Sequence, residues 1–224
     1  MVPVYGARWG TRGRLLSRKF LFLGPPAAGK GTQAALIASE LGIAHISTGD
    51  MLRDQVARRT ELGRTIETML AAGELVPDDL VVSLLPDRLA REDAVPGFVL
   101  DGFPRTQSQA VSLETLLGED GLDRVVALVV PEEEIVRRIT GRRSCAEGHV
   151  YHVSGLPPKV AGVCDIDGLS LFQRSDDTED VVRNRLAVYL ASTAPLMERY
   201  SAILVKVDGI GSVEDIKARI LAVV

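Results

Sequence analysis

The sequence predicts an α/β fold in which a parallel β-sheet is covered by helices on both faces. Short apolar runs alternate with longer helical patterns, and five such runs are found, at residues 19–23, 44–47, 97–101, 125–130 and 203–207. Two of them, 97–101 and 125–130, have the unbroken apolar character of strands that are buried on both faces. A turn rich in glycine and proline follows the first run, which is typical of a strand that leads into a helix.

The elements follow one another in a regular order. The first apolar run ends at Gly24, and a helical pattern then covers residues 30–41, with apolar residues at Ala34, Ile37 and Leu41. Further helical patterns fill the gaps between the apolar runs, at residues 78–91, 108–117, 132–140, 179–200 and 213–224. Because strands and helices alternate, the strands are expected to pair in parallel.

Two regions interrupt the alternation and are predicted to be insertions over the sheet. Residues 47–76 contain two short helical patterns, and residues 141–177 are rich in glycine and proline with short β-like pieces. The core is then expected at 19–46, 77–140 and 178–224. Residues 1–18 form an N-terminal extension, for which we predict a disordered tail or an over-extended start rather than an Arg-rich transit peptide, because its glycines disfavour an amphipathic helix.

Composition and charge narrow the class of protein. The 224 residues are 46% hydrophobic and 25% charged, which fits one main domain with subdomains. Five of the 26 basic residues lie within residues 1–19, so the rest of the chain has 21 basic residues against 30 acidic ones. This balance argues against a nucleic-acid partner. No apolar run approaches the roughly 20 residues of a membrane span, so we expect no membrane partner and a cytoplasmic location.

A phosphate-binding loop is indicated between the first strand and the first helix. The sequence there is Gly24-Pro-Pro-Ala-Ala-Gly29-Lys30-Gly31-Thr32. Glycines allow a tight turn whose N–H groups converge at the helix N-terminus, where an anion is favoured. A lysine in the first helical turn is disfavoured by the helix dipole, so a plain turn would not require Lys30.

Two more polar loops follow the second and third strands. They read Ser47-Thr-Gly-Asp-Met-Leu-Arg53 and Asp101-Gly-Phe-Pro-Arg-Thr106, with Gln109 one turn later. In open parallel sheets the ligand crevice lies at the carboxyl ends of the strands, so these loops should share one cleft with the phosphate loop. Taken singly, Thr48, Asp50 or Asp101 could equally be helix caps.

From Phe20 to its end, the chain resembles the adenylate kinase family of nucleoside monophosphate kinases. The motif at 101–106 is the most specific, and further matches are Gly73-Glu-Leu-Val76, Arg138-Ile-Thr-Gly-Arg-Arg143, Arg174-Ser-Asp-Asp177, Arg183-Asn-Arg-Leu186 and Lys206-Val-Asp-Gly209. The resemblance implies a P-loop three-layer fold with a five-stranded parallel sheet. It also implies reversible conversion of ATP and AMP into two ADP with Mg²⁺, a helical AMP-binding insertion at 47–76 and a small β-rich lid at 141–177.

The family pattern implies a role for individual residues of this chain. Lys30 and Arg105 would face the transferring group, with Arg142, Arg174 and Arg185 completing a cationic clamp and Asp101 orienting water around Mg²⁺. Residues implied to contact ATP are Ala27, Ala28, Gly29, Lys30, Gly31, Thr32, Arg138, Arg142, Val150, Tyr151 and Gly211. Residues implied to contact AMP are Thr48, Arg53, Glu74, Leu75, Val76, Gly102, Phe103, Pro104, Arg105, Gln109, Arg174 and Arg185. Planar arginine donors suit a phosphoryl group whose charge spreads during transfer.

One departure concerns the phosphate loop. The family commonly has glycine where this chain has Ala27, so activity could be lower if that position needs a positive φ angle.

In some family members zinc ties the lid, and the corresponding stretch here offers Cys145, His149, Cys164 and Asp167. The spacings are C-x3-H and C-x2-D, and Zn²⁺ accepts sulfur, nitrogen and oxygen donors. A lid held by hydrogen bonds around buried thiols, or by a disulfide, is the alternative.

Other functions remain open at the level of sequence. A sister kinase could use GTP as donor or another monophosphate as acceptor. A P-loop switch or ATPase would lack a second nucleotide site, and a zinc-knuckle RNA binder is disfavoured by the acidic body. Two insertions that must move freely suggest a monomer whose partners are ATP, AMP and ADP.

Overall fold

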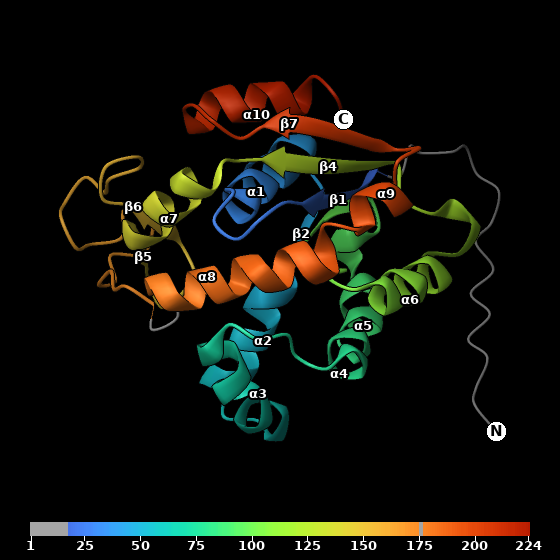
Figure 1. Cartoon of the computed structure of the whole chain (residues 1–224), viewed down its shortest axis with the longest axis horizontal. Helices are drawn as coiled ribbons and strands as arrows, with labels where there is room; N and C mark the ends of the chain where they lie inside the picture. The colour runs from blue at the N-terminus through green and yellow to red at the C-terminus, as the bar shows by residue number, and fades with distance from the viewer. Residues whose placement is uncertain (1–17, 175–176) are drawn as a thin grey trace.

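The computed structural model of the chain describes residues 18–174 and 177–224. Its centre is a five-stranded parallel sheet in the order β2-β3-β1-β4-β7 (Figure 1). The strands are β1 (Arg18–Leu23), β2 (Ala44–Ser47), β3 (Gly97–Asp101), β4 (Arg124–Val129) and β7 (Leu204–Asp208). The predicted α/β fold with a five-stranded parallel sheet is therefore confirmed. Residues 1–17 of the predicted extension lie outside the described residues, whereas Arg18 is the first residue of β1.

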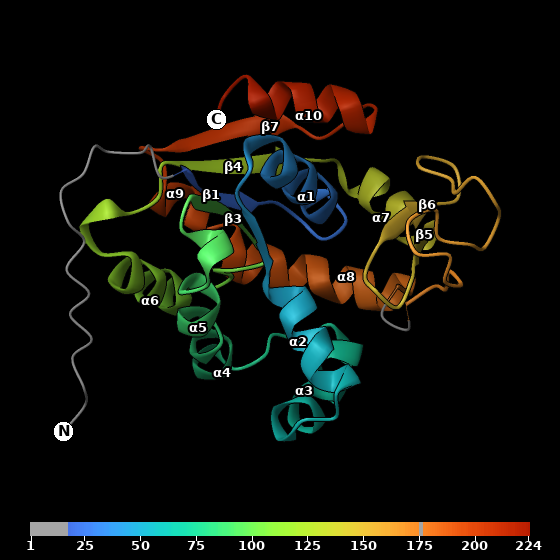
Figure 2. The same cartoon turned by 180° about the vertical axis from the view of Figure 1, so that it is seen from behind.

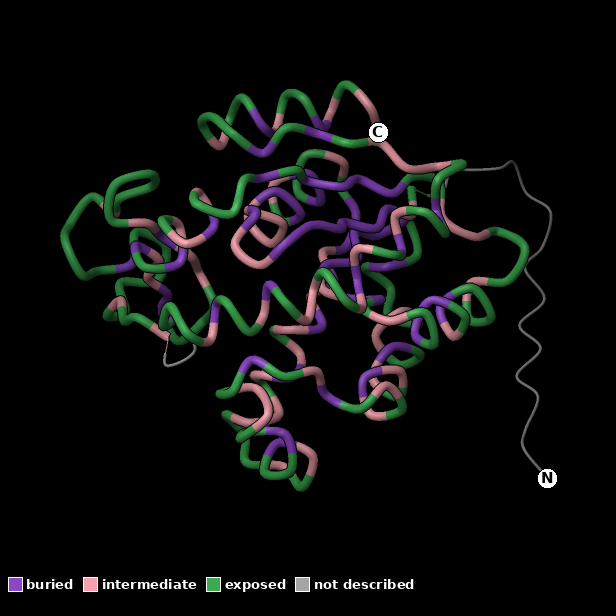
Figure 3. The backbone as a smooth tube through the Cα atoms, viewed as in Figure 1, coloured by how far each residue is buried: buried purple, intermediate pink, exposed green. Residues whose placement is uncertain are grey.

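Helices pack on both faces of this sheet, because side chains of a strand alternate between the faces. Phe20 and Phe22 of β1 point into one apolar cluster, and Leu21 and Leu23 point into the other. The first cluster is closed by α1 (Lys30–Leu41), α7 (Glu132–Thr140), α8 (Glu179–Val188) and α10 (Val213–Leu221). The second is closed largely by α4 (Asp78–Ser83), α5 (Leu85–Leu89), α6 (Gln107–Leu117) and α9 (Leu196–Arg199). The buried residues accordingly concentrate along the strands (Figure 3).

Two small units project from the sheet. One consists of α2 (Thr48–Ala57) and α3 (Glu61–Ala72), which approach so closely that a Cβ atom on Gly63 would lie 2.0 Å from the carbonyl oxygen of Gln55. The other contains the antiparallel pair β5 (Arg142–Ser144) and β6 (Val150–His152). Figure 2 shows the β5–β6 unit at the right and the α2–α3 unit at the bottom, with α8 leading from the β5–β6 unit toward the sheet.

Two predicted helices are interrupted in the structure. The pattern at 78–91 divides into α4 and α5, and a 3₁₀ turn follows at Glu92–Ala94. The pattern at 179–200 becomes α8, a π-helical turn at Tyr189–Thr193 and α9. A proline lies near each break, Pro86 at the start of α5 and Pro195 before α9. Proline has no backbone N–H, so it cannot continue the hydrogen-bond ladder of a helix.

Within residues 18–174 and 177–224, no helix is both long enough and apolar enough to cross a membrane.

Candidate functional site

The loop between β1 and α1 adopts the tight turn that its glycines permit. Gly24 has φ 144°, and a Cβ atom there would lie 2.8 Å from the carbonyl oxygen of Leu128. Gly29 has φ 92° and is the N-cap of α1, which has no acidic residue in its first turn. Ala27 has φ 54°, so the position where the family commonly has glycine does require a positive φ in this chain.

Lys30 folds back over this loop. Its Nζ donates hydrogen bonds of 2.7 Å to the carbonyl oxygens of Gly24 and Pro25. Burial lowers the pKa of Lys30 to about 8, against the opposing effect of Asp101, and the charges of Arg105 and Arg142 lower it further. The side chains of Lys30, Asp101, Arg105 and Arg142 therefore lie close enough together for their charges to interact.

Asp101 ends β3 and faces the start of α1. It is 9% exposed, and its Oδ2 lies 3.2 Å from the place where a Cβ atom on Gly31 would stand. A larger residue at Gly31 would therefore press on the carboxylate. Carboxylate oxygen is the donor that Mg²⁺ prefers, so Asp101 fits the implied metal beside the phosphate loop.

The predicted arginines lie near Asp101 and near one another. Arg105 reaches solvent, but the atoms crowding its guanidinium lower its pKa; Asp101 opposes this shift, and the charges of Arg185 and Arg53 add to it. Burial lowers the pKa of Arg174 to about 10, and Arg53 and Arg142 are the next contributors. These cations shift one another's pKa values, which shows that they lie near one another. The group consists of five arginines, namely Arg53, Arg105, Arg142, Arg174 and Arg185.

Acidic side chains hold part of this cationic cluster. Arg142 pairs with the buried carboxylate of Asp177, its Nε donating to Oδ2 at 2.9 Å. Arg53 pairs with Asp50. Burial opposes ionisation of Asp50, but the charge of Arg53 and hydrogen bonds from Arg53 and Ser47 outweigh it, so the pKa of Asp50 is lowered.

The residues expected on the acceptor side line the end of β3 and the first of the projecting units. Thr48 is buried, and its hydroxyl donates to the carbonyl oxygen of Asp101 at 3.5 Å. Gly102 has φ 81° and would place a Cβ atom 3.2 Å from a guanidinium nitrogen of Arg105. The others differ in exposure, with Val76, Phe103, Pro104 and Gln109 buried, Leu75 half-buried and Glu74 exposed.

The residues expected on the donor side are more dispersed. Arg138 donates to the carbonyl oxygens of Ala28, at 3.3 Å, and Gly209, at 2.7 Å, and so links the phosphate loop to the loop after β7. That second loop contains Gly211, which has φ 125°. Tyr151 points into its own unit, where its hydroxyl accepts from the backbone N–H of Asp165 at 2.7 Å. The implied contacts of all these residues with ATP and AMP, including those of Val150, Tyr151 and Thr32, stay predictions.

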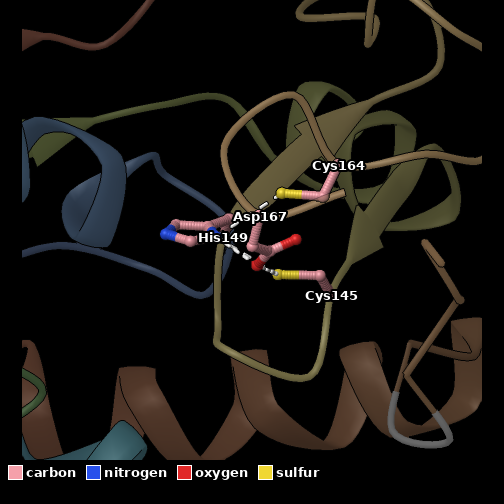
Figure 4. A group of neighbouring side chains, drawn as sticks. All are labelled: Cys145, His149, Cys164 and Asp167. Carbon is pink, nitrogen blue, oxygen red and sulfur yellow. Dashed lines mark hydrogen bonds and ion pairs between the residues drawn. The ribbon is translucent and has the colours of Figure 1, made fainter. Parts of the chain in front are cut away.

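A second cluster lies in the unit built around β5 and β6 (Figure 4). The ligand-type atoms of Cys145, His149, Cys164 and Asp167 all lie within 4.8 Å of one another. Two turns present them: the N–H of Gly148 donates to the Cys145 carbonyl, and the N–H of Gly168 donates to the Cys164 carbonyl. The thiols are free rather than joined in a disulfide.

The dimensions of this cluster suit a tetrahedral metal. A zinc ion with bonds of about 2.0–2.3 Å would separate its ligand atoms by about 3.3–3.8 Å. The His149 Nδ1 lies 3.3 Å from Cys145 Sγ, 3.5 Å from Cys164 Sγ and 2.9 Å from Asp167 Oδ2. Small outward movements would give the tetrahedron, and two thiolates, an imidazole and a carboxylate are donors that Zn²⁺ accepts.

Comparison with known proteins decides the family. The family model described as adenylate kinase matches residues 22–204. The chain belongs to the adenylate kinase family. Relatives named adenylate kinase include one from Acidothermus cellulolyticus, 52% identical over 91% of this chain and 96% of the relative. Another from Anaeromyxobacter sp. is 51% identical over 90% and 98%, and one from Streptomyces avermitilis is 47% identical over 90% and 94%.

Family membership explains why the loops of this chain meet, but the sequence analysis missed several supports of the site. A helix cap was one interpretation of Asp50, but its pairing with Arg53 was not predicted. No role was predicted for Asp78 or Thr193. Both of the latter contact the loop that contains Arg105. A short carboxylate or hydroxyl at the end of a helix reads as a cap, so no local signal distinguishes them.

Proposed function

We propose that the chain transfers the terminal phosphoryl group of MgATP reversibly to AMP, giving two molecules of ADP. The observation that carries the proposal is a group of interacting charges in which Lys30, at the phosphate loop, and Asp101 lie near five arginines. A hydrolase needs one nucleotide site. Here the cations are supplied by the phosphate loop and also by Arg53 on α2 and Arg105 after β3, which is consistent with a second phosphate site.

The proposed mechanism is positioning and charge stabilisation. The AMP phosphate is the nucleophile, so no side chain forms a covalent bond with the phosphoryl group. Lys30 and the N–H groups of the loop would bind the donor phosphates, and Arg105 with Arg142 would follow the equatorial oxygens as their charge spreads. Mg²⁺ bound with ATP would neutralise phosphate charge, and Asp101 would orient its water.

Closure of residues 141–177 over the cleft would complete the site. Water competes with AMP as an acceptor, so the cleft must exclude it during transfer. Arg142 and Arg174 support this role, because both lie within that segment and both interact with charges outside it. Arg142 acts on Lys30 of the core, and Arg174 acts on Arg53 and Asp50 of the insertion 47–76. We therefore retain 141–177 as a lid and 47–76 as the AMP-binding insertion.

We further propose a structural zinc in the lid, held by Cys145, His149, Cys164 and Asp167. The buried cluster of this unit consists of Tyr151 and the two proposed ligands Cys145 and Cys164, so a unit with so small a core gains stability from such a metal. We expect about one zinc per chain, and a lower Tm after chelation. Replacing His149→Gln should reduce zinc content, whereas His152→Gln, which alters the one other histidine of this segment, should not. Equal zinc loss from both variants would count against the proposed ligand set.

The enzyme is proposed to act as a cytoplasmic monomer. The cytoplasm supplies both nucleotides and keeps the two thiols reduced, and each inserted unit must swing without obstruction.

The deciding experiment measures ADP formation with ATP and Mg²⁺ in a coupled assay. AMP, GMP, UMP and CMP are added separately, and GTP replaces ATP in a parallel series. ADP that forms only when ATP and AMP are both present supports the proposal. Release of phosphate with no monophosphate present would identify a hydrolase and overturn it.

A further inference from the structure

Asp78 occupies a special place between the AMP-binding insertion and the core. It is the first residue of α4, separated from the segment 47–76 only by Pro77, and it is half-buried. Its carboxylate accepts two hydrogen bonds of 2.7 Å, one from the Thr106 hydroxyl and one from the Gln109 side-chain amide. Both donors belong to the segment that follows β3 and contains Arg105.

This contact fixes the orientation of the Gln109 amide. An ionised carboxylate can only accept hydrogen bonds, so the NH₂ group of Gln109 must face Asp78. The amide oxygen then faces the opposite way, where it accepts from the backbone N–H of Arg105 at 2.7 Å. Gln109 is only 2% exposed, so water cannot easily replace either contact.

The other side of the Arg105 backbone is held as well. The carbonyl oxygen of Arg105 accepts from the hydroxyl of Thr193 at 2.9 Å. The Nε of Arg105 donates to the carbonyl oxygen of Gly102 at 2.8 Å, which sets the direction of the guanidinium. A hydrogen bond therefore restrains each end of the residue, and the one at its N–H depends on Gln109 being turned correctly.

We infer that Asp78 is a positioning residue that orients Gln109 and, through it, holds Arg105 in register for the AMP phosphate. The inference rests on the proposed function. Without the carboxylate, the Gln109 amide can rotate and present its NH₂ group to the N–H of Arg105, where two donors repel. Displacement of a phosphate clamp by about 1 Å can reduce transfer by about 100-fold.

A different reading is that Asp78 merely stabilises α4, since an acidic residue in the first turn of a helix interacts favourably with the helix dipole. The chain contains its own control for this effect. Asp79 lies in the same first turn and is exposed. Asp79→Ala removes the same charge from the same turn but leaves the contacts to Thr106 and Gln109 intact.

The test compares Asp78→Ala with Asp79→Ala in the full chain by steady-state kinetics and by hydrogen exchange at the Arg105 amide. Asp78→Ala is expected to lower kcat/KM for AMP by about 10- to 100-fold, to leave the KM for ATP within about twofold, and to speed exchange of the Arg105 N–H. Asp79→Ala is expected to change none of these. Asp78→Asn, which keeps one oxygen for Gln109, should recover most of the loss.

Equal kinetics for Asp78→Ala and Asp79→Ala would overturn the inference, as would a loss shared equally by AMP and ATP. If Asp78→Ala does not fold, Asp78→Ser against Asp79→Ser decides the same question, because the serine hydroxyl is too short to contact both donors. Failure of the proposed function looks different: the unaltered chain would then form no ADP from ATP and AMP.

Discussion

Arg142 and Asp177 lie at the two ends of the segment 141–177, and their side chains form a paired ion bridge that joins these ends. The Arg142 Nε donates to Asp177 Oδ2 at 2.9 Å, and the second guanidinium nitrogen pairs with Oδ1. The side chain of Asp177 is fully buried and that of Arg142 is 18% exposed. Residues 175–176 of this segment lie outside the described part of the chain.

Replacing Asp177→Asn should loosen the base of this segment. The amide accepts one bond from Arg142 but turns an NH₂ group toward the second donor, and a buried donor without a partner costs about 1–3 kcal/mol. Local opening should then speed hydrogen exchange in β5 and β6 by about 5- to 100-fold, with no change in α10. Asp54→Asn, which removes an exposed pair with Arg58, is the control. Unchanged exchange in β5 would contradict the assigned role of the pair.

Ala27→Gly should raise the thermal stability slightly. Ala27 is held at φ 54°, which costs a residue with a Cβ atom about 1–2 kcal/mol. Glycine removes that strain but adds about 0.5–1 kcal/mol of unfolded-state entropy, so the net gain should be up to about 1.5 kcal/mol, visible as a higher Tm.

Ala28→Gly is the matched control, because Ala28 is fully buried and is not among the residues with positive φ. It should lower Tm. A fall in Tm for Ala27→Gly as large as that for Ala28→Gly would show that the phosphate loop carries no strain at Ala27.

The lowered pKa of Lys30 predicts how stability depends on pH. Its pKa is about 8 in the folded chain against a model-peptide value near 10.5. Between these two values the unfolded chain binds a proton that the folded chain does not, so this residue makes stability rise with pH from about 8 to 10.5. The ceiling of the effect is about 3 kcal/mol.

Lys30→Met removes the titrating group while keeping a flexible side chain. As the pH rises from 7 to 10, the unaltered chain should gain unfolding free energy relative to Lys30→Met, measured by urea denaturation at each pH. Parallel pH profiles for the two proteins would show that the pKa of Lys30 is not lowered.

The strands could be predicted from the sequence because their signal is local. The run that became β3 is apolar up to its last residue, Asp101, and is buried at every position. The glycines at 24 and 29 indicate the turn at the end of β1. The helix at 179–200 was predicted too long, because its apolar spacing continues through Pro195 although the backbone widens into a π turn before it. The spacing of apolar residues shows which side chains face the core. It does not show where the backbone hydrogen bonds of a helix are interrupted by a proline.

Residues of the candidate site could be predicted where they belong to a short sequence motif. They could not be predicted where the contact joins residues that lie far apart in the sequence. The four residues of the metal-type cluster and the arginines were predicted from short motifs. The structure brings the four residues together in one place and the arginines together in another. The hydrogen bond between Thr193 and Arg105 joins residues 88 positions apart, and that between Asp78 and Gln109 joins residues 31 apart. Such contacts follow from packing of α4, α6 and the π turn, which no local pattern encodes.

Thr193→Val should weaken acceptor turnover with little effect on the donor. Valine keeps the shape of threonine but removes the hydroxyl that holds the Arg105 carbonyl, and Thr193 is only 7% exposed, so water cannot substitute freely. Leaving that acceptor without a partner costs about 1–3 kcal/mol, which corresponds to about 5- to 100-fold in kcat/KM for AMP if Arg105 shifts. The KM for ATP should change by less than about twofold, since the phosphate loop makes no contact with this hydroxyl.

Thr193→Ser restores the hydroxyl without the methyl group and should recover most of the activity toward AMP, even though it leaves a small cavity. Thr115→Val serves as control, because Thr115 is exposed and its hydroxyl donates to the carbonyl oxygen of Val111 within α6. If Thr193→Ser were as impaired as Thr193→Val, packing of the methyl group would explain the loss. If instead serine rescues turnover while Tm stays low, the hydroxyl itself, by its hydrogen bond to the Arg105 carbonyl, is what turnover of AMP requires.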